Sequence, residues 1–114
     1  MTPAEARAAL VAGLRAEGLK VAEIGQDVAP PCVYVKRKGS ATEVVALAGG
    51  VRSIFAVHWI PVRGVEDPAG QDDAHAKILD ACEPLAVEPV ELDESSVTIG
   101  DQSWPCDLGL VVMF

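Results

Sequence analysis

The stretch Val28-Ala29-Pro30-Pro31-Cys32-Val33-Tyr34-Val35 decides how the amino-terminal part of this chain folds. The two prolines fix φ and remove two backbone donors, so they end the preceding element and begin an extended segment. The run that follows, residues 32–35, is apolar and rich in β-branched residues, which is typical of a strand, here expected over residues 32–36. The sequence therefore predicts a strand that starts directly after the proline pair.

A helix is predicted ahead of this stretch. Thr2-Pro3-Ala4-Glu5 has the form of a capping box, in which the Thr2 hydroxyl and the Glu5 carboxylate each accept a backbone N–H at the helix start. Pro3 suits the first turn because its missing donor is not needed there. Gly18 supplies the left-handed residue that ends the helix. The residues expected on its buried face are Ala6, Leu10, Val11 and Leu14.

The segments around the first strand are expected to be short. Residues 19–24 alternate as a strand, and residues 25–31 form a loop. Lys36-Arg37-Lys38-Gly39-Ser40 has the composition of a basic turn, and residues 43–47 continue as the second arm of a hairpin. Gly49-Gly50 is expected to break that arm.

Residues 51–62 are predicted to form a central strand, because both of their alternating sets of side chains are apolar. A second helix is expected to start at Asp67-Pro68 and to end before Pro84. The apolar residues expected on its buried face are Ala74, Ile78 and Cys82, with Leu79 beside them.

The carboxyl-terminal part is expected to hold a linker and two strands. Residues 85–95 contain Pro89 and four acids, so we expect a mostly exposed linker or edge. A short strand at 97–99, a turn at 100–103 and a last strand at 108–114 follow. This order predicts a single α+β domain over residues 1–114: a mixed or antiparallel sheet of four to five strands with two helices packed against it.

The charge of the chain is unevenly distributed. The net charge is −8, made up of +3 over residues 1–63 and −11 over residues 64–114. A chain with basic and acidic halves favours head-to-tail contacts between unlike surfaces, the geometry that closes into a ring. The alternative is that the two halves interleave in the fold and no bipolar surface forms.

No catalytic, cofactor or metal site is predicted. The three cysteines, Cys32, Cys82 and Cys106, and the two histidines form no Cys-x-x-Cys, His-x-x-x-His or Gly-x-Ser-x-Gly pattern. Buried cysteines behave as small apolar residues, and three do not make a disulfide framework, which favours a cytosolic origin. We expect His58 to be a buried imidazole with satisfied nitrogens and His75 to face solvent. No secretory leader or membrane span is expected.

The arrangement of these elements resembles one family, the tail terminator (tail completion) proteins of long-tailed bacteriophages. The resemblance extends over most of the chain: an amino-terminal helix, the step Asp27-x-x-Pro30-Pro31-Cys32, a long strand ending at residues 59–62 and leading into the helix at 71–81, and a final strand. Such proteins assemble as six-fold rings that cap the tail tube and join it to the head–tail connector. The resemblance carries over no catalytic residue and no cofactor.

This resemblance implies a structural protein of the virion, at the head-proximal end of the tail, assembled in the host cytoplasm. Its partners would be further copies of itself in a homohexameric ring, the tail tube protein and the connector or neck protein; no membrane is involved. Genome DNA would pass without specific binding, because an acidic channel wall repels phosphates. The residues that we expect at the interfaces are Lys36, Arg37, Lys38, Arg52, Arg63, Glu91, Asp93 and Glu94.

Other functions stay open at this point. A neck or head–tail joining protein of the same class fits the same pattern. The Lys36–Lys38 cluster fits a solvated hairpin tip as well as a docking tip, whereas specific DNA recognition is disfavoured by the acidic chain and the lack of adjacent aromatics. From different classes, a small cytosolic enzyme with Cys32 or Cys106 as nucleophile and a monomeric acidic adaptor remain alternatives.

Overall fold

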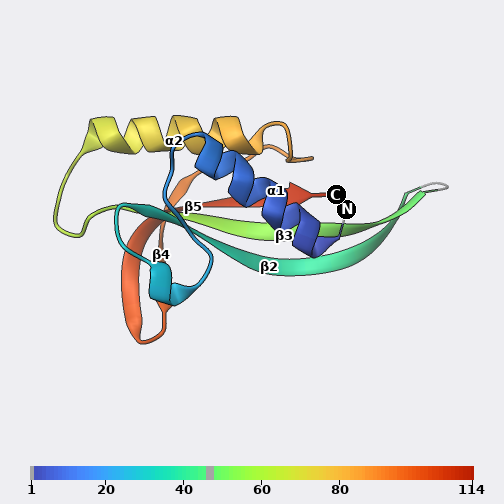
Figure 1. Cartoon of the computed structure of the whole chain (residues 1–114), viewed down its shortest axis with the longest axis horizontal. Helices are drawn as coiled ribbons and strands as arrows, with labels where there is room; N and C mark the ends of the chain where they lie inside the picture. The colour runs from blue at the N-terminus through green and yellow to red at the C-terminus, as the bar shows by residue number, and fades with distance from the viewer. Residues whose placement is uncertain (1, 46–47) are drawn as a thin grey trace.

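The computed structural model describes residues 2–45 and 48–114, with side chains for 2–40 and 51–114. Two helices lie on one side of a curved five-stranded sheet, and a long hairpin extends away from them (Figure 1). The elements in chain order are α1 (Pro3–Ala16), β1 (Val21–Ala22), the 3-10 turn η1 (Gly25–Asp27), β2 (Cys32–Val45), β3 (Ala48–Ile60), α2 (Pro68–Cys82), β4 (Asp93–Ile99) and β5 (Gln102–Met113).

Helix α1 has the start and the end that its sequence predicts. The Thr2 side chain accepts from the Glu5 N–H at 3.1 Å, and the Thr2 N–H donates to Glu5 Oε1 at 3.2 Å. Gly18 has φ +84°, the left-handed conformation that favours glycine after a helix. The four predicted apolar residues of its inner face are buried.

The sheet has the strand order β1-β2-β3-β5-β4. Strands β1 and β2 run parallel, and the other neighbours run antiparallel, which confirms the predicted α+β class with a mixed sheet. Strand β3 lies in the middle, as predicted, between β2 and β5. Helix α2 begins at Pro68 with Asp67 as its N-cap and ends at Cys82, also as predicted.

The main core lies between the helices and one face of the sheet. Alternate residues of β3 point to this face, among them Phe55, Val57 and Trp59, and helix residues such as Leu10 and Ile78 pack over them. The other face has a smaller cluster at one end, formed by Cys32, Ile60, Val97 and Cys106. The sheet therefore buries both faces at this end, because its outer strand curls back towards η1: a Cβ added at Gly25 would lie 2.5 Å from the Ile99 side chain.

The prediction of a basic turn at residues 36–40 is wrong. Lys36, Arg37 and Lys38 lie within the continuous strand β2, which pairs with β3 from Cys32↔Ile60 to Val45↔Ala48. A bulge between Arg37 and Gly39 accommodates the extra residue, so the strand bends there without ending. Residues 43–45 therefore belong to the first arm of the hairpin, not to the second, and Gly49-Gly50 continues β3 instead of breaking it. Residues 46–47 of the predicted arm lie outside the described residues.

Three smaller predictions are also corrected. The strand expected at 19–24 is only Val21–Ala22, because β1 pairs with β2 over two residues. The last hairpin is longer than predicted: β4 begins at Asp93, and β5 begins at Gln102. Leu79 is 38% exposed and therefore lies outside the buried face of α2.

Candidate assembly surfaces

The hairpin of β2 and β3 forms an arm that extends beyond the rest of the sheet. Strand β5 pairs with β3 only between Ser53 and Trp59, whereas β2 and β3 stay paired as far as Val45↔Ala48. The outer part of the arm is thus a two-stranded ribbon, and Figure 1 shows it projecting away from both helices. A two-stranded ribbon is marginally stable alone in water, so a surface that covers it would stabilise it.

The three basic residues predicted at an interface lie where this arm leaves the body. All three side chains, of Lys36, Arg37 and Lys38, are exposed. Strand β1 pairs with only Val33 and Tyr34 of β2, so in the described part of the chain the outer edge of β2 has no strand neighbour beyond Tyr34. The basic residues therefore mark an open sheet edge.

Four other predicted interface residues come together in one groove. The groove has a volume of about 560 Å³ and lies on the sheet face opposite the helices, with Ile54, Leu108, Leu110 and Val112 along its floor. Leu110 is 40% exposed although it lies within strand β5. The charged residues along the groove are Arg52, Glu88, Glu91, Asp93 and Glu94. An apolar floor with a mostly acidic rim suits a partner that carries apolar and basic groups.

Arg63, the eighth predicted interface residue, is engaged within the chain. Its guanidinium lies over the Trp104 ring, 4.9 Å from the centroid, and donates to the backbone oxygen of Ser103. It joins the segment after β3 to the β4–β5 hairpin and is not part of the groove or of the basic edge. The structure thus separates the eight residues into a basic edge, an acidic groove and one internal contact.

A polar cluster that the sequence analysis missed joins α2 to β5. His75 Nε2 lies 2.8 Å from Asp107 Oδ2, and Gln71 Nε2 donates to the same oxygen at 2.9 Å. The side chains of His75 and Asp107 are 25% and 10% exposed, so the expectation that His75 faces solvent is wrong. An acid at a core-facing position of an otherwise apolar strand was the available signal, since a buried carboxylate requires partners.

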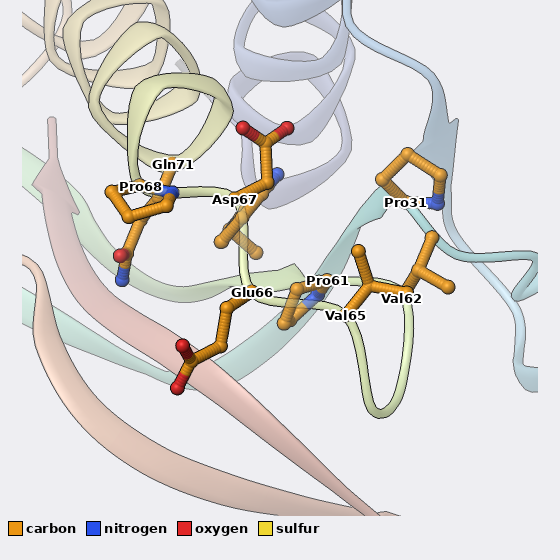
Figure 2. A pocket seen from close by; sticks show the side chains of 9 residues that line it. Pro31, Pro61, Val62, Val65, Glu66, Asp67, Pro68 and Gln71 are labelled. Atoms are coloured by element: carbon orange, nitrogen blue, oxygen red, sulfur yellow. The ribbon is translucent and has the colours of Figure 1, made fainter.

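A second hollow lies beside this cluster. It has a volume of about 400 Å³ and is lined by prolines and valines together with Trp59, whose ring meets His75 edge-on at 6.0 Å between centroids. Figure 2 shows Pro31 on the β2 side, Pro68 and Gln71 on the α2 side, and Val62 with Val65 from the loop between β3 and α2. Its lining is largely apolar, with Glu66 and Asp67 at the loop.

The thiols and His58 are set in unreactive surroundings. All three cysteines are buried and free. Burial raises the pKa of Cys32, and it raises the pKa of Cys82 and of Cys106 to about 11. His58 is 6% exposed, its Nδ1 lies 3.2 Å from the backbone oxygen of Tyr34, and burial lowers its pKa. This confirms His58 as a buried imidazole.

Within the described residues, no group of three or more acids, cysteines and histidines is placed to hold a metal ion. No described helix has the length and apolar character needed to cross a membrane. Comparison with protein-family models and with curated proteins finds no match to this chain.

Proposed function

We propose that this protein is a structural assembly protein of a phage virion: a homohexameric ring that terminates the tail tube and joins it to the head–tail connector. The observation that carries the proposal is the projecting β2–β3 arm, because a two-stranded ribbon with an open basic edge is suited to contact another subunit. The acidic groove, on the sheet face opposite the helices, supplies a surface whose charge is opposite to that of the basic edge. Unlike surfaces on one subunit are what a head-to-tail ring needs.

The surroundings of the thiols favour this proposal over an enzyme with a cysteine nucleophile. A nucleophilic cysteine needs a lowered pKa and access to substrate. Cys106 is 4% exposed and its pKa is raised to about 11. Cys32 is 3% exposed, and burial raises its pKa as well. A neck or head–tail joining protein of the same class would use the same surfaces.

The proposal also includes a passage for DNA. The excess of acids over residues 64–114 would repel phosphates at a channel wall, so the genome would pass through the ring without being bound. A ring whose inner wall is positive would contradict this part of the proposal.

The test is tube capping in a mixture of purified components. Tail tube protein is allowed to polymerise with and without this protein, and the tube lengths and ends are imaged by negative-stain electron microscopy. We expect six-fold rings at the ends of tubes that stop growing, and we expect these capped tubes to join to heads when heads are added in a second step. Tubes that continue to elongate, with no density at their ends, would refute the proposal. The test variant has Lys36, Arg37 and Lys38 changed to Glu, and we expect it to cap fewer tubes. The matched control is Asp72→Lys with Asp80→Lys on the exposed side of α2, which should cap tubes as wild type does.

A further inference from the structure

We infer that neighbouring copies of this chain join by pairing the outer edge of β4 in one copy with the outer edge of β2 in the next. The inference rests on the proposed ring and names the contact that would build it. Strands β2 and β4 are the long outer strands of the sheet, since β1 covers only two residues of β2. An open strand edge offers unpaired backbone donors and acceptors, and another strand is the partner that satisfies them.

The backbone groups on the β4 edge can be assigned from its pairing with β5. Ser96 lies opposite Pro105, which has no N–H, so these two residues cannot exchange both hydrogen bonds. In an antiparallel pair, hydrogen-bonded and non-hydrogen-bonded positions alternate. The N–H and C=O groups of Glu94, Ser96 and Thr98 therefore point away from β5, towards the open edge. All three residues are exposed.

The β2 edge can be assigned in the same way. The Val33 N–H donates to the backbone oxygen of Lys20 at 2.8 Å, so Val33 directs its groups to the outer side. By the alternation of a strand, Val35 and Arg37 direct theirs to the same side. Val35 is fully buried, so the exposed outward groups begin at Arg37. Beyond Tyr34, no strand in the described part of the chain pairs with these groups.

Charge selects which edges can meet. The β2 edge carries Lys36, Arg37 and Lys38, and the β4 edge carries Asp93 and Glu94. Two β2 edges would place positive groups together, and two β4 edges would place negative groups together, so symmetric dimers through either edge are disfavoured. Only β2 against β4 brings unlike charges together. Contact between two different edges of identical copies is heterologous, and it closes into a ring when the rotation allows.

Strand direction agrees with this pairing. Successive strands β2, β3, β5 and β4 alternate in direction, so β4 runs opposite to β2. Copies related by rotation about an axis along the strands keep their strand directions, so β4 would meet the next β2 antiparallel. Strand β4 pairs with the part of β5 farthest from the arm, and the open part of β2 lies towards the arm. The two edges are therefore offset along the strand direction. Pairing them requires the strands to be tilted relative to the ring axis, as strands are in closed barrels, while their directions are still kept from copy to copy.

The first test exchanges the charges. One variant carries Lys36→Glu, Arg37→Glu and Lys38→Glu, so both of its edges are acidic; the other carries Asp93→Lys and Glu94→Lys, so both are basic. We expect each variant alone to associate about tenfold or more weakly than wild type in low salt, and an equimolar mixture to regain assembly. Native mass spectrometry and analytical ultracentrifugation measure this. Asp72→Lys with Asp80→Lys, on the exposed side of α2, is the matched control and should assemble normally.

The second test blocks the backbone. Ser96→Pro removes one outward N–H at a position that does not donate to β5, whereas Ser96→Ala keeps that N–H. Circular dichroism and thermal melting check that both variants fold. We expect Ser96→Pro to lose assembly by about tenfold or more and Ser96→Ala to retain it.

Three outcomes would overturn the inference: a mixture that fails to regain assembly, a folded Ser96→Pro variant that assembles as well as Ser96→Ala, or a wild-type chain that stays monomeric at every concentration. If wild-type rings form and these variants do not disturb them, the edge contact is refuted while the proposed ring stands. If wild type stays monomeric, tube capping decides the proposed function separately.

Discussion

Replacing Asp107 should weaken the packing of α2 against the sheet and lower the stability of the protein more than replacing an exposed acid does. Its carboxylate accepts from Gln71 Nε2 at 2.9 Å and lies 2.8 Å from His75 Nε2, and its side chain is 10% exposed. A hydrogen bond to a charged group contributes about 1.5–3 kcal/mol. Since the His75 side chain is 25% exposed, water can replace part of the hydrogen bonding that His75 loses when Asp107 is removed. We therefore expect Asp107→Ala to lower the free energy of unfolding by about 2–3 kcal/mol, which is about 10 °C in Tm.

Urea unfolding at neutral pH, followed by tryptophan fluorescence and circular dichroism, measures this loss. Asp107→Asn keeps one acceptor and should cost about 1 kcal/mol. Asp101→Asn, in the exposed turn between β4 and β5, is the control and should change stability by less than about 0.5 kcal/mol. A double-mutant cycle with His75→Ala should give a coupling energy of about 0.5–3 kcal/mol. The reasoning is refuted if Asp107→Ala matches the control, or if the coupling with His75 is absent.

Two further predictions concern buried titratable groups. Because burial raises the pKa of Cys82 and Cys106 to about 11 from 9.0, native protein should react with an alkylating reagent about 100-fold more slowly than urea-unfolded protein, as followed by mass spectrometry at pH 8. Equal rates in the two states would contradict this. Burial also lowers the pKa of folded His58, with a smaller contribution from Lys36, so the unfolded chain binds the proton more readily. The contribution of neutral His58 to the free energy of unfolding is therefore fully present above pH 6.5. It is lost as the pH falls through the lowered pKa of His58 in the folded state. Urea unfolding between pH 5 and 7.5 should show a smaller acid-side loss in His58→Asn than in wild type, and identical pH profiles would contradict the assignment.

The predictions that succeeded depend on neighbouring residues. The capping box at Thr2 and Glu5 and the Asp67-Pro68 start of α2 are local signals, and local hydrogen bonds and φ restrictions produce them in the fold. The proline pair sets the start of β2 at Cys32 for the same reason. The central place of β3 followed from its two apolar faces, since such a strand must be covered on both sides.

The candidate surfaces depend on residues that are far apart in the chain. Lys36-Arg37-Lys38-Gly39 has the composition of a turn, yet pairing with β3 holds it in a strand, because the hydrogen bonds of a long hairpin outweigh weak local preferences. Arg52 lies more than thirty positions before Glu88, and only the sheet order places them along one groove. His75 and Asp107 likewise meet because α2 packs over β5.

The sequence by itself therefore determined the starts of the helices, the α+β class and the separation of charge along the chain. Tertiary structure alone decided that the basic residues lie on one open sheet edge and that Asp93 and Glu94 lie on the other. The physical reason is that local composition sets where an element begins, whereas strand pairing between distant segments sets which edges stay open and which charges they carry.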